Sequence, residues 1–153
     1  MPQAAPGSTQ GNQISTNCVT AGGDNSGCAF VSNSAQSYGD GFNSAGGGVY
    51  AHLLATNGIT VYFFPRSSIP SDITAGAPQP SGWGTPLAFF PSTNCDIPSH
   101  FNSHNLVFDI TMCGQWAGAA YGGSGCPGSC IEAVADPSNF QSEPSWIDNI
   151  NAR

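Results

Sequence analysis

Carboxylates are the residues of this chain that could support acid–base chemistry. Cleaving a glycosidic bond takes two carboxyl groups that face each other across a cleft. The nine acidic residues are Asp24, Asp40, Asp72, Asp96, Asp109, Glu132, Asp136, Glu143 and Asp148. No two of them stand two or four residues apart on a predicted strand. Glu132 and Asp136 have a four-residue interval only on a helical turn, where a solvated surface pair is expected. Asp109 lies among apolar neighbours and is predicted to anchor a loop, so we predict no catalytic residue.

Nucleophiles and metal ligands are equally scarce. No serine lies in a Gly-x-Ser-x-Gly elbow. His100 and His104 flank a Ser/Asn segment and are expected to hydrogen-bond loop carbonyls, and neither has cysteines at zinc-knuckle spacing. Cys126 and Cys130 are close, but no second pair matches them. We therefore predict no metal and no cofactor. His52, on a predicted hairpin strand, fits a structural or a ligand-binding role, and we count it among the candidate binding residues.

An even number of cysteines favours disulfides over metal ligation. The six are Cys18, Cys28, Cys95, Cys113, Cys126 and Cys130. Six cysteines allow fifteen full pairings, and the sequence does not choose among them. Disulfides imply an oxidising compartment, although Met1 opens no signal-peptide pattern. We expect a secreted protein whose export signal was removed or lies upstream of this chain.

Aromatic rings and neutral polar groups are what remain for function. Rings stack on apolar ligand faces, while amides and hydroxyls supply directional hydrogen bonds. Tyr50 and Tyr62 lie on two predicted hairpin strands, and Trp83 and Trp116 are flanked by glycines that leave them little cover. The alternative for each is that the ring fills the core, which is the role that we expect for Trp146. These residues predict a ligand-binding surface.

The composition excludes whole classes of partner. The 153 residues include no lysine and two arginines, and the formal net charge is −7. Such a chain has no cationic patch for phosphates, so we expect neither nucleic-acid binding nor attraction to anionic membranes. No apolar stretch is long enough for a transmembrane helix. The low charge and the many Ser, Thr and Asn residues favour an extracellular protein that meets neutral polysaccharides.

The pattern along the chain predicts a β protein with long loops. Residues 1–48 are mostly loop, with one or two short strands pinned by Cys18 and Cys28, and residues 49–150 are rich in strands. The strongest signal is a hairpin of Val49–Thr56 and Ile59–Phe64 around Asn57-Gly58. Further short strands are predicted at 87–90, 106–112 and 146–150, and helical turns at 70–73 and 130–135. No repeat or charged linker divides the chain, so we expect one domain over residues 1–153.

Five segments of the sequence resemble a known family. They are Gly46-Gly-Gly-Val-Tyr-Ala51, Val61-Tyr-Phe-Phe-Pro-Arg-Ser-Ser-Ile-Pro-Ser-Asp-Ile73, Trp83-Gly-Thr-Pro86, Cys95-Asp-Ile97 and Cys113-Gly-Gln-Trp-Ala-Gly118. In this order and spacing they are similar to fungal glycoside hydrolase family 16 enzymes, the laminarinase-like endo-β-1,3(4)-glucanases. The resemblance covers nearly the whole chain. It implies an all-β, antiparallel β-sandwich, a concanavalin-like jelly roll with a glucan cleft on its concave face.

The resemblance also implies what this chain lacks. The family's catalytic strand carries Glu-x-Asp-x-x-Glu and lies upstream of the matched region, so the chain resembles the C-terminal half of the fold. Trp116 and Gln115 match the family's Cys-Gly-Asp-Trp cleft segment, although Gln115 replaces a frequent Asp. Other departures are Val49 where many members have Trp, His52-Leu53 where they have Met-Glu, and Tyr62 where Trp is frequent.

Half a jelly roll leaves an open sheet edge and an uncovered apolar face. Either the strands close into a smaller sandwich, or the chain forms a homodimer through the exposed edge, or it is a fragment separated from its N-terminal partner. The first hypothesis is a non-catalytic, lectin-like protein that binds β-glucan or a related glycan through Trp116, Gln115, Tyr50, Tyr62, His52 and Trp83. The alternative is a glucanase whose catalytic carboxylates come from a missing segment or partner chain. A weaker third hypothesis is a structural protein with an inert cleft.

Overall fold

The computed structural model describes residues 8–19, 27–105, 107 and 112–140. They belong to two compact units, Met1–His104 and Asn105–Arg153. The strand predicted at 106–112 lies mostly outside the described residues, and the one at 146–150 lies wholly outside them.

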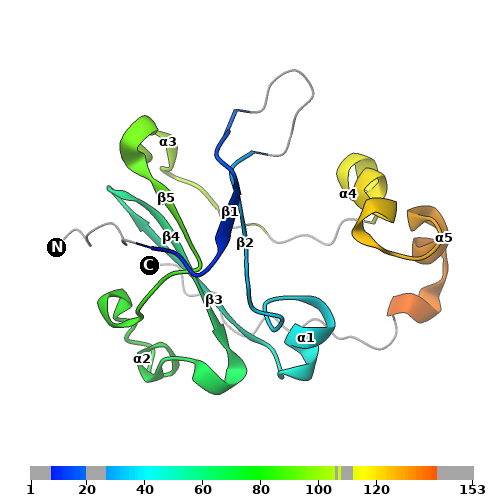
Figure 1. Ribbon diagram of the computed structural model, residues 1–153, viewed down its shortest axis with the longest axis horizontal. Coiled ribbons are helices and arrows are strands. Elements are labelled where there is room, and N and C mark those ends of the chain that lie inside the picture. Colours follow the sequence, from blue (N-terminus) through cyan, green and yellow to red (C-terminus); the bar gives the residue numbers. More distant parts are fainter. Residues whose placement is uncertain (1–7, 20–26, 106, 108–111, 141–153) are drawn as a thin grey trace. The chain divides into compact units, whose positions relative to one another are not determined.

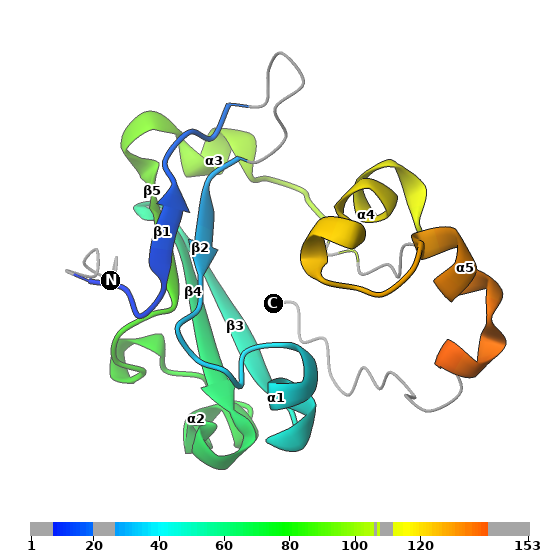
Figure 2. The ribbon, with the colours of Figure 1, turned by 45° about the vertical axis from the view of Figure 1, so that its right-hand side comes forward.

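The first unit is built from two antiparallel sheets (Figures 1 and 2). The smaller sheet pairs β1 with β2, and the larger one has the order β3-β4-β5. The strands are β1 (Asn12–Ser15), β2 (Ala29–Val31), β3 (Gly48–Ala55), β4 (Gly58–Pro65) and β5 (Ala88–Pro91). Short helices connect them: α1 (Gly39–Ser44), α2 (Ser71–Thr74) and, after β5, α3 (Ile97–His100). The predicted all-β, antiparallel class is confirmed.

The β3–β4 hairpin exists as predicted, but its turn is displaced by one residue. Ala55 pairs with Gly58, so Thr56 and Asn57 form the turn and Gly58 is already part of β4. Gly58 also pairs with Pro91 of β5. A Cβ at this position would collide with the Phe90 carbonyl oxygen and the Phe89 ring. Gly58 also has a φ of 150°, so both the close approach of β5 and its own backbone conformation favour glycine here.

The register of the larger sheet sorts its side chains onto two faces. One face carries Tyr50, which pairs with Phe63 of β4, and Phe90, which pairs with Ile59. The smaller sheet covers part of this face, because Phe30 of β2 contacts Phe90 edge-on with 5.2 Å between ring centroids. Helix α1 covers another part through Phe42, whose ring lies 6.3 Å from that of Phe63.

The opposite face holds the best-buried side chains. Tyr62 is 2% exposed and Thr60, two residues earlier on the same strand and face, is 6% exposed. Pro86 is the largest side chain that is fully buried in the described residues. The core of this unit is therefore thin, and several large apolar side chains remain in contact with solvent.

Strand β3 has a free edge within the described part of the chain. The Arg66 backbone N–H donates a hydrogen bond to the Gly47 carbonyl oxygen at 3.0 Å. In this register, the backbone N–H and C=O groups of the odd-numbered residues of β3 point toward β4. Since alternate residues of an antiparallel strand point their backbone groups to opposite sides, Gly48, Tyr50, His52 and Leu54 point theirs to the free edge. Among the described strands, none pairs with that side.

The described part of the second unit is helical. It contains α4 (Gly114–Ala120), a 3₁₀ turn at Gly122–Ser124, α5 (Cys130–Ala135) and a 3₁₀ turn at Pro137–Phe140. The helical turns predicted at 70–73 and 130–135 correspond to α2 and α5, whereas α1 and α4 were not predicted. None of the helices in the described residues has the length and apolarity needed to cross a lipid bilayer.

Two disulfides pin the loops. Cys18–Cys28 closes the loop between β1 and β2, and Cys113–Cys130 joins the start of α4 to the start of α5. Cys95 and Cys126 carry free thiols, which departs from the prediction that all six cysteines pair. Cys95 belongs to the first compact unit and Cys126 to the second.

Candidate functional site

An exposed stripe along β3 collects two of the predicted binding residues. Tyr50 is 45% exposed and Leu54 is 54% exposed. His52 lies between them on the same face and is exposed as well. Strand alternation places all three side chains on one side, so the stripe offers an aromatic ring, an imidazole and an apolar side chain in a row.

Tyr50 is held in place at both ends of its ring. The ring lies on Phe63 with a centroid distance of 4.9 Å, and its hydroxyl donates a hydrogen bond to the Ser37 carbonyl. Partial burial raises the pKa of Tyr50 above its ordinary value, although the bond to Ser37 acts in the opposite direction. The phenol therefore stays protonated and serves as a donor at neutral pH.

Tyr62 and Trp83 occupy a different environment from Tyr50. Tyr62 is buried, and its ring meets the Trp83 indole edge-on at 5.1 Å. Phe64 completes the cluster, 5.6 Å from Trp83 and stacked on Tyr62 at 6.0 Å. A ring covered in this way presents no face to a ligand. The structure thus gives Tyr62 the core role that the sequence left open as its alternative.

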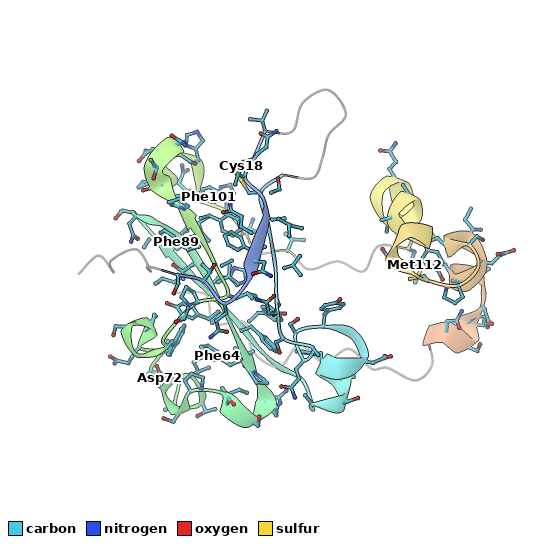
Figure 3. The ribbon with its side chains drawn as sticks, in the orientation of Figure 1. Cys18, Phe64, Asp72, Phe89, Phe101 and Met112 are labelled. Carbon is cyan, nitrogen blue, oxygen red and sulfur yellow. A yellow bond between two sulfur atoms is a disulfide. The ribbon has the colours of Figure 1, made fainter. Side chains whose placement is uncertain are left out.

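Asp72 explains why Trp83 turns inward despite its flanking glycines (Figure 3 labels Asp72 and Phe64). The Trp83 indole N–H donates to Asp72 Oδ2 at 2.8 Å, and the Gln79 N–H donates to the same oxygen at 2.6 Å. Ile73 N–H donates to the other oxygen at 3.0 Å. Desolvation acts to raise the pKa of Asp72, but these hydrogen bonds outweigh it and hold the pKa below its ordinary value.

The second unit contains the other predicted cleft residues. Gln115 and Trp116 lie in the first turn of α4, and the Gln115 side chain is exposed. The conformation of the Trp116 side chain lies outside the described residues. Cys113, directly before the helix, has a φ of 64°, a left-handed conformation that is uncommon for any residue other than glycine. Its disulfide to Cys130 fixes the start of α4 beside α5.

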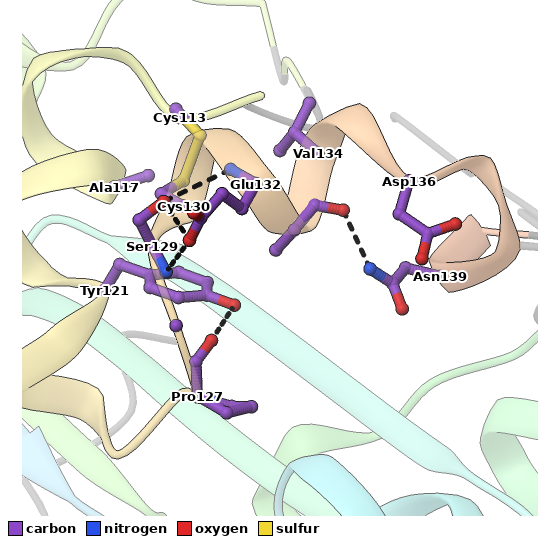
Figure 4. A pocket seen from close by; sticks show the side chains of 12 residues that line it. Cys113, Ala117, Tyr121, Pro127, Ser129, Cys130, Glu132, Val134, Asp136 and Asn139 are labelled. Atoms are coloured by element: carbon purple, nitrogen blue, oxygen red, sulfur yellow. Dashed lines mark hydrogen bonds between the residues drawn. A yellow bond between two sulfur atoms is a disulfide. The ribbon is translucent and has the colours of Figure 1, made fainter.

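A hollow of about 640 Å³ opens between α4 and α5 (Figure 4). Tyr121 donates a hydrogen bond to the Pro127 carbonyl at 3.1 Å on one side of it. On the other side, Asn139 donates to the Ala133 carbonyl at 2.8 Å. The polar groups that line the hollow are thus engaged in holding the loops that form it.

Three of the described carboxylates have local structural roles. Asp72 anchors Trp83, as described above. Glu132 and Ser129 form a reciprocal capping box at the start of α5. Asp136 accepts from the Ser138 hydroxyl at 2.7 Å and from its N–H at 2.9 Å, and these bonds lower its pKa.

The remaining carboxylates are either exposed or lie outside the described residues. Asp40 is exposed, and Asp96 precedes α3. Four carboxylates lie outside the described residues: Asp24, Asp109, Glu143 and Asp148. Among the described residues, no group of three His, Cys, Asp or Glu side chains could hold a metal ion.

Sequence comparison then places the chain in a family. Residues 2–151 match the family described as the XgeA-like, catalytic GH16 domain. The chain belongs to glycoside hydrolase family 16. The predicted resemblance to laminarinase-like glucanases of this family is confirmed.

Curated members of family 16 are similar over most of this chain. A probable glycosidase of Schizosaccharomyces pombe is 47% identical over 140 residues, covering 89% of this chain and 33% of that protein. An endo-1,3(4)-beta-glucanase of Emericella nidulans is 42% identical over 129 residues, covering 84% of this chain and 19% of that protein. The chain spans a third or less of the length of these relatives.

Solved family 16 structures confirm the jelly-roll class. Laminarinase 16A from Phanerochaete chrysosporium, solved with β-glucans in both donor and acceptor sites, has a TM-score of 0.78 and 44% identity. That match covers 87% of this chain and 47% of the laminarinase. An elongating family 16 β-1,3-glucosyltransferase has a TM-score of 0.75 and 42% identity. The chain therefore spans about half the length of these solved structures.

Proposed function

We propose that this chain binds β-glucan and does not cleave it on its own. Membership in family 16 supports a role that involves β-glucan. The observation that carries the non-catalytic part is that three of the described carboxylates, Asp72, Glu132 and Asp136, each accept hydrogen bonds that hold neighbouring residues in place. A general acid or nucleophile needs an oxygen directed at the substrate instead.

The exposed stripe of β3 supplies the chemistry that glucan binding needs. Tyr50 offers part of a ring face, and His52 adds a hydrogen-bonding imidazole on the same side. In the second unit, Gln115 adds an exposed amide at the start of α4. Neutral groups of this kind suit an uncharged polysaccharide better than an anionic ligand, given the net charge of −7.

A second candidate is a glucan-active enzyme completed by another polypeptide segment. It is favoured by one observation, namely that the solved relatives are about twice as long as the matched region. In that case the catalytic carboxylates come from outside this chain, and the stripe on β3 contributes to substrate binding. We place the protein in an oxidising, extracellular compartment in both cases, because it forms two disulfides.

One experiment separates these functions. The purified chain is incubated with insoluble β-1,3-glucan, and bound protein and released reducing sugar are measured in parallel. Binding without release supports the first function, and release supports the second. If the chain neither binds the glucan nor releases reducing sugar, both functions are contradicted. A Trp116→Ala variant tests the second unit: we expect weaker retention on the glucan, whereas unchanged retention would remove α4 from the binding surface.

A further inference from the structure

An open hollow of about 400 Å³ lies between β2 and α1, and its lining includes none of Tyr50, His52 and Gln115. The segments 32–35 and 38–40 form its walls. Its most prominent feature is Tyr38, whose side chain is 77% exposed. Tyr38 is more exposed than Tyr50, which is 45% exposed. The Tyr38 ring is therefore accessible to a ligand that enters the hollow.

The loop that carries Tyr38 is held rigidly by its neighbours. Ser37 is 3% exposed, and its hydroxyl donates to the Ser34 carbonyl at 2.8 Å. Gly41 lies so close to the Ala35 carbonyl that a Cβ there would collide with it. The Tyr50 hydroxyl holds the loop from the other side, through the Ser37 carbonyl.

Asn33 ties the same loop to β1. Its amide N–H donates to the Gln10 carbonyl at 2.8 Å, and its amide oxygen accepts from Asn12 at 2.9 Å. Both sides of the hollow are thus fixed without any ligand. A preorganised site loses less conformational entropy on binding than a mobile loop would.

The hollow presents the groups that recognise a polyol. Asp40 is exposed and lines it, and its carboxylate has no hydrogen bond or ion pair with any described residue. The Ser32 and Ser34 hydroxyl oxygens accept from the backbone N–H groups of Ser34 and Gln36 at 3.1 and 3.2 Å. Their own O–H groups remain available as donors. A ring face, a carboxylate acceptor and hydroxyl donors therefore surround one space.

This set of groups selects among ligand classes. A divalent cation is disfavoured, because Asp40 is the single carboxylate in the lining and cations such as calcium take six to eight oxygen ligands. An anionic ligand is disfavoured, since the lining contains no Lys, Arg or His. A neutral sugar fits, because its apolar face can stack on Tyr38 while its hydroxyls bond to Asp40 and Ser34.

We propose that Tyr38, Asp40 and Ser34 form an additional subsite for a pyranose unit of β-glucan. The proposal rests on the glucan-binding function proposed above and extends it beyond β3. The hydrogen bond between Tyr50 and Ser37 links the two surfaces, because Ser37 directly precedes Tyr38 in the chain. A glucan chain contacting Tyr50 thus has the Tyr38 subsite beside it.

The test is calorimetric titration of the whole chain with soluble β-1,3-gluco-oligosaccharides. Tyr38→Ala removes the stacking face and is expected to weaken binding about five-fold, within the range measured for aromatic contacts. Tyr38→Phe keeps the ring and should stay within about two-fold of the parent. Asp40→Asn removes the charge without changing the shape, and we expect about three-fold weaker binding. Ile14→Ala is the matched control, because Ile14 is a 66% exposed side chain of the same unit that lies outside the hollow.

The outcomes separate this inference from the proposed function. If the parent binds and both Tyr38→Ala and Asp40→Asn bind equally well, the subsite is wrong and the glucan-binding function stands. If the parent does not bind, both are overturned. Tyr38 and Asp40 are exposed, so their variants should retain the parent's thermal midpoint. Should Tyr38→Ala fail to fold, Asp40→Asn alone decides the matter.

Discussion

The hydroxyl of Tyr50 donates a hydrogen bond to the carbonyl of Ser37, thirteen residues earlier in the chain. This bond joins the edge strand β3 to the loop that precedes α1. Among the described residues, no backbone hydrogen bond between different elements joins the same two segments. The exposed stripe on β3 is therefore linked through Tyr50 to the loop that carries Tyr38.

Replacing Tyr50 by Phe should destabilise the folded chain, because it removes the hydrogen bond to Ser37 while keeping the ring. We expect a loss of about 1 kcal/mol in the free energy of unfolding, the usual net value of one hydrogen bond. Urea denaturation measures it, and faster amide exchange in the loop around Ser37 should accompany it. Tyr38→Phe is the matched control, because the Tyr38 hydroxyl has no partner among the described residues. Equal stability of the two variants would show that the bond contributes nothing.

Asp72 should make the first unit sensitive to acid. Its pKa is lowered in the folded state from the unfolded value of 3.8. A depressed folded pKa stabilises the protein above the unfolded pKa, and this contribution is lost as the pH falls through the folded pKa. Urea unfolding from pH 7 to pH 2 should therefore show a decline that begins near pH 4. Asp72→Asn should be less stable than the parent at pH 7 and should converge toward it at pH 2.

A companion variant tests which donor matters for Asp72. Trp83→Phe keeps an aromatic ring in the cluster but removes the indole donor, so its pH dependence should be shallower than that of the parent. A Trp83→Phe variant with the parent's full pH dependence would assign the effect to the backbone donors of Gln79 and Ile73 alone.

The cysteines should divide into two chemical classes. Thiol titration of the unfolded, unreduced chain should count two free thiols, Cys95 and Cys126. In the folded chain the exposed Cys126 should react faster than the half-buried Cys95. A count of zero would show a third disulfide between them, which the structure does not contain.

The Cys113–Cys130 disulfide should be the main stabilising cross-link of the second unit. It spans 17 residues, and closing a loop of that length restricts the unfolded chain by about 3 kcal/mol. The double variant Cys113→Ser, Cys130→Ser should lose about that much stability, whereas Cys126→Ser should behave as the parent. Thermal unfolding followed by far-ultraviolet circular dichroism compares the three.

The free edge of β3 should pair with a second copy of the chain. Gly48, Tyr50, His52 and Leu54 point their backbone groups outward, and β3 contains neither a charge nor a proline to block pairing. Sedimentation equilibrium should show mass above the 15.6 kDa monomer as concentration rises. Leu54→Lys should restore the monomer, while Ile131→Lys, an exposed position on α5, should not. A monomeric parent at every concentration would contradict the pairing.

The hairpin shows how far the sequence could predict the fold. Alternating β-formers around Asn57-Gly58 predicted both strands, because that signal is local. The turn itself moved to Thr56-Asn57, since Gly58 is needed where β5 passes. That requirement arises from a strand thirty residues later, which no local pattern contains.

The candidate site likewise contains residues that local patterns could predict and residues that depend on distant parts of the chain. Exposure of Tyr50 and His52 follows from strand alternation, so it could be predicted. Trp83 could not, because its flanking glycines suggested exposure while an acceptor eleven residues earlier, Asp72, draws the indole inward. Tyr38 was overlooked because a lone tyrosine in a polar loop gives no periodic signal, and α1 beside it is only six residues long.

The inward-facing Trp83 also gives the protein an optical label. The first compact unit contains this one tryptophan, whereas Trp116 and Trp146 both belong to the second. An indole packed against Tyr62 and Phe64 emits at shorter wavelength than one in water, and it shifts to the red when that cluster opens. A variant that keeps only Trp83 would thus report by fluorescence on the melting of the first unit, independently of the second.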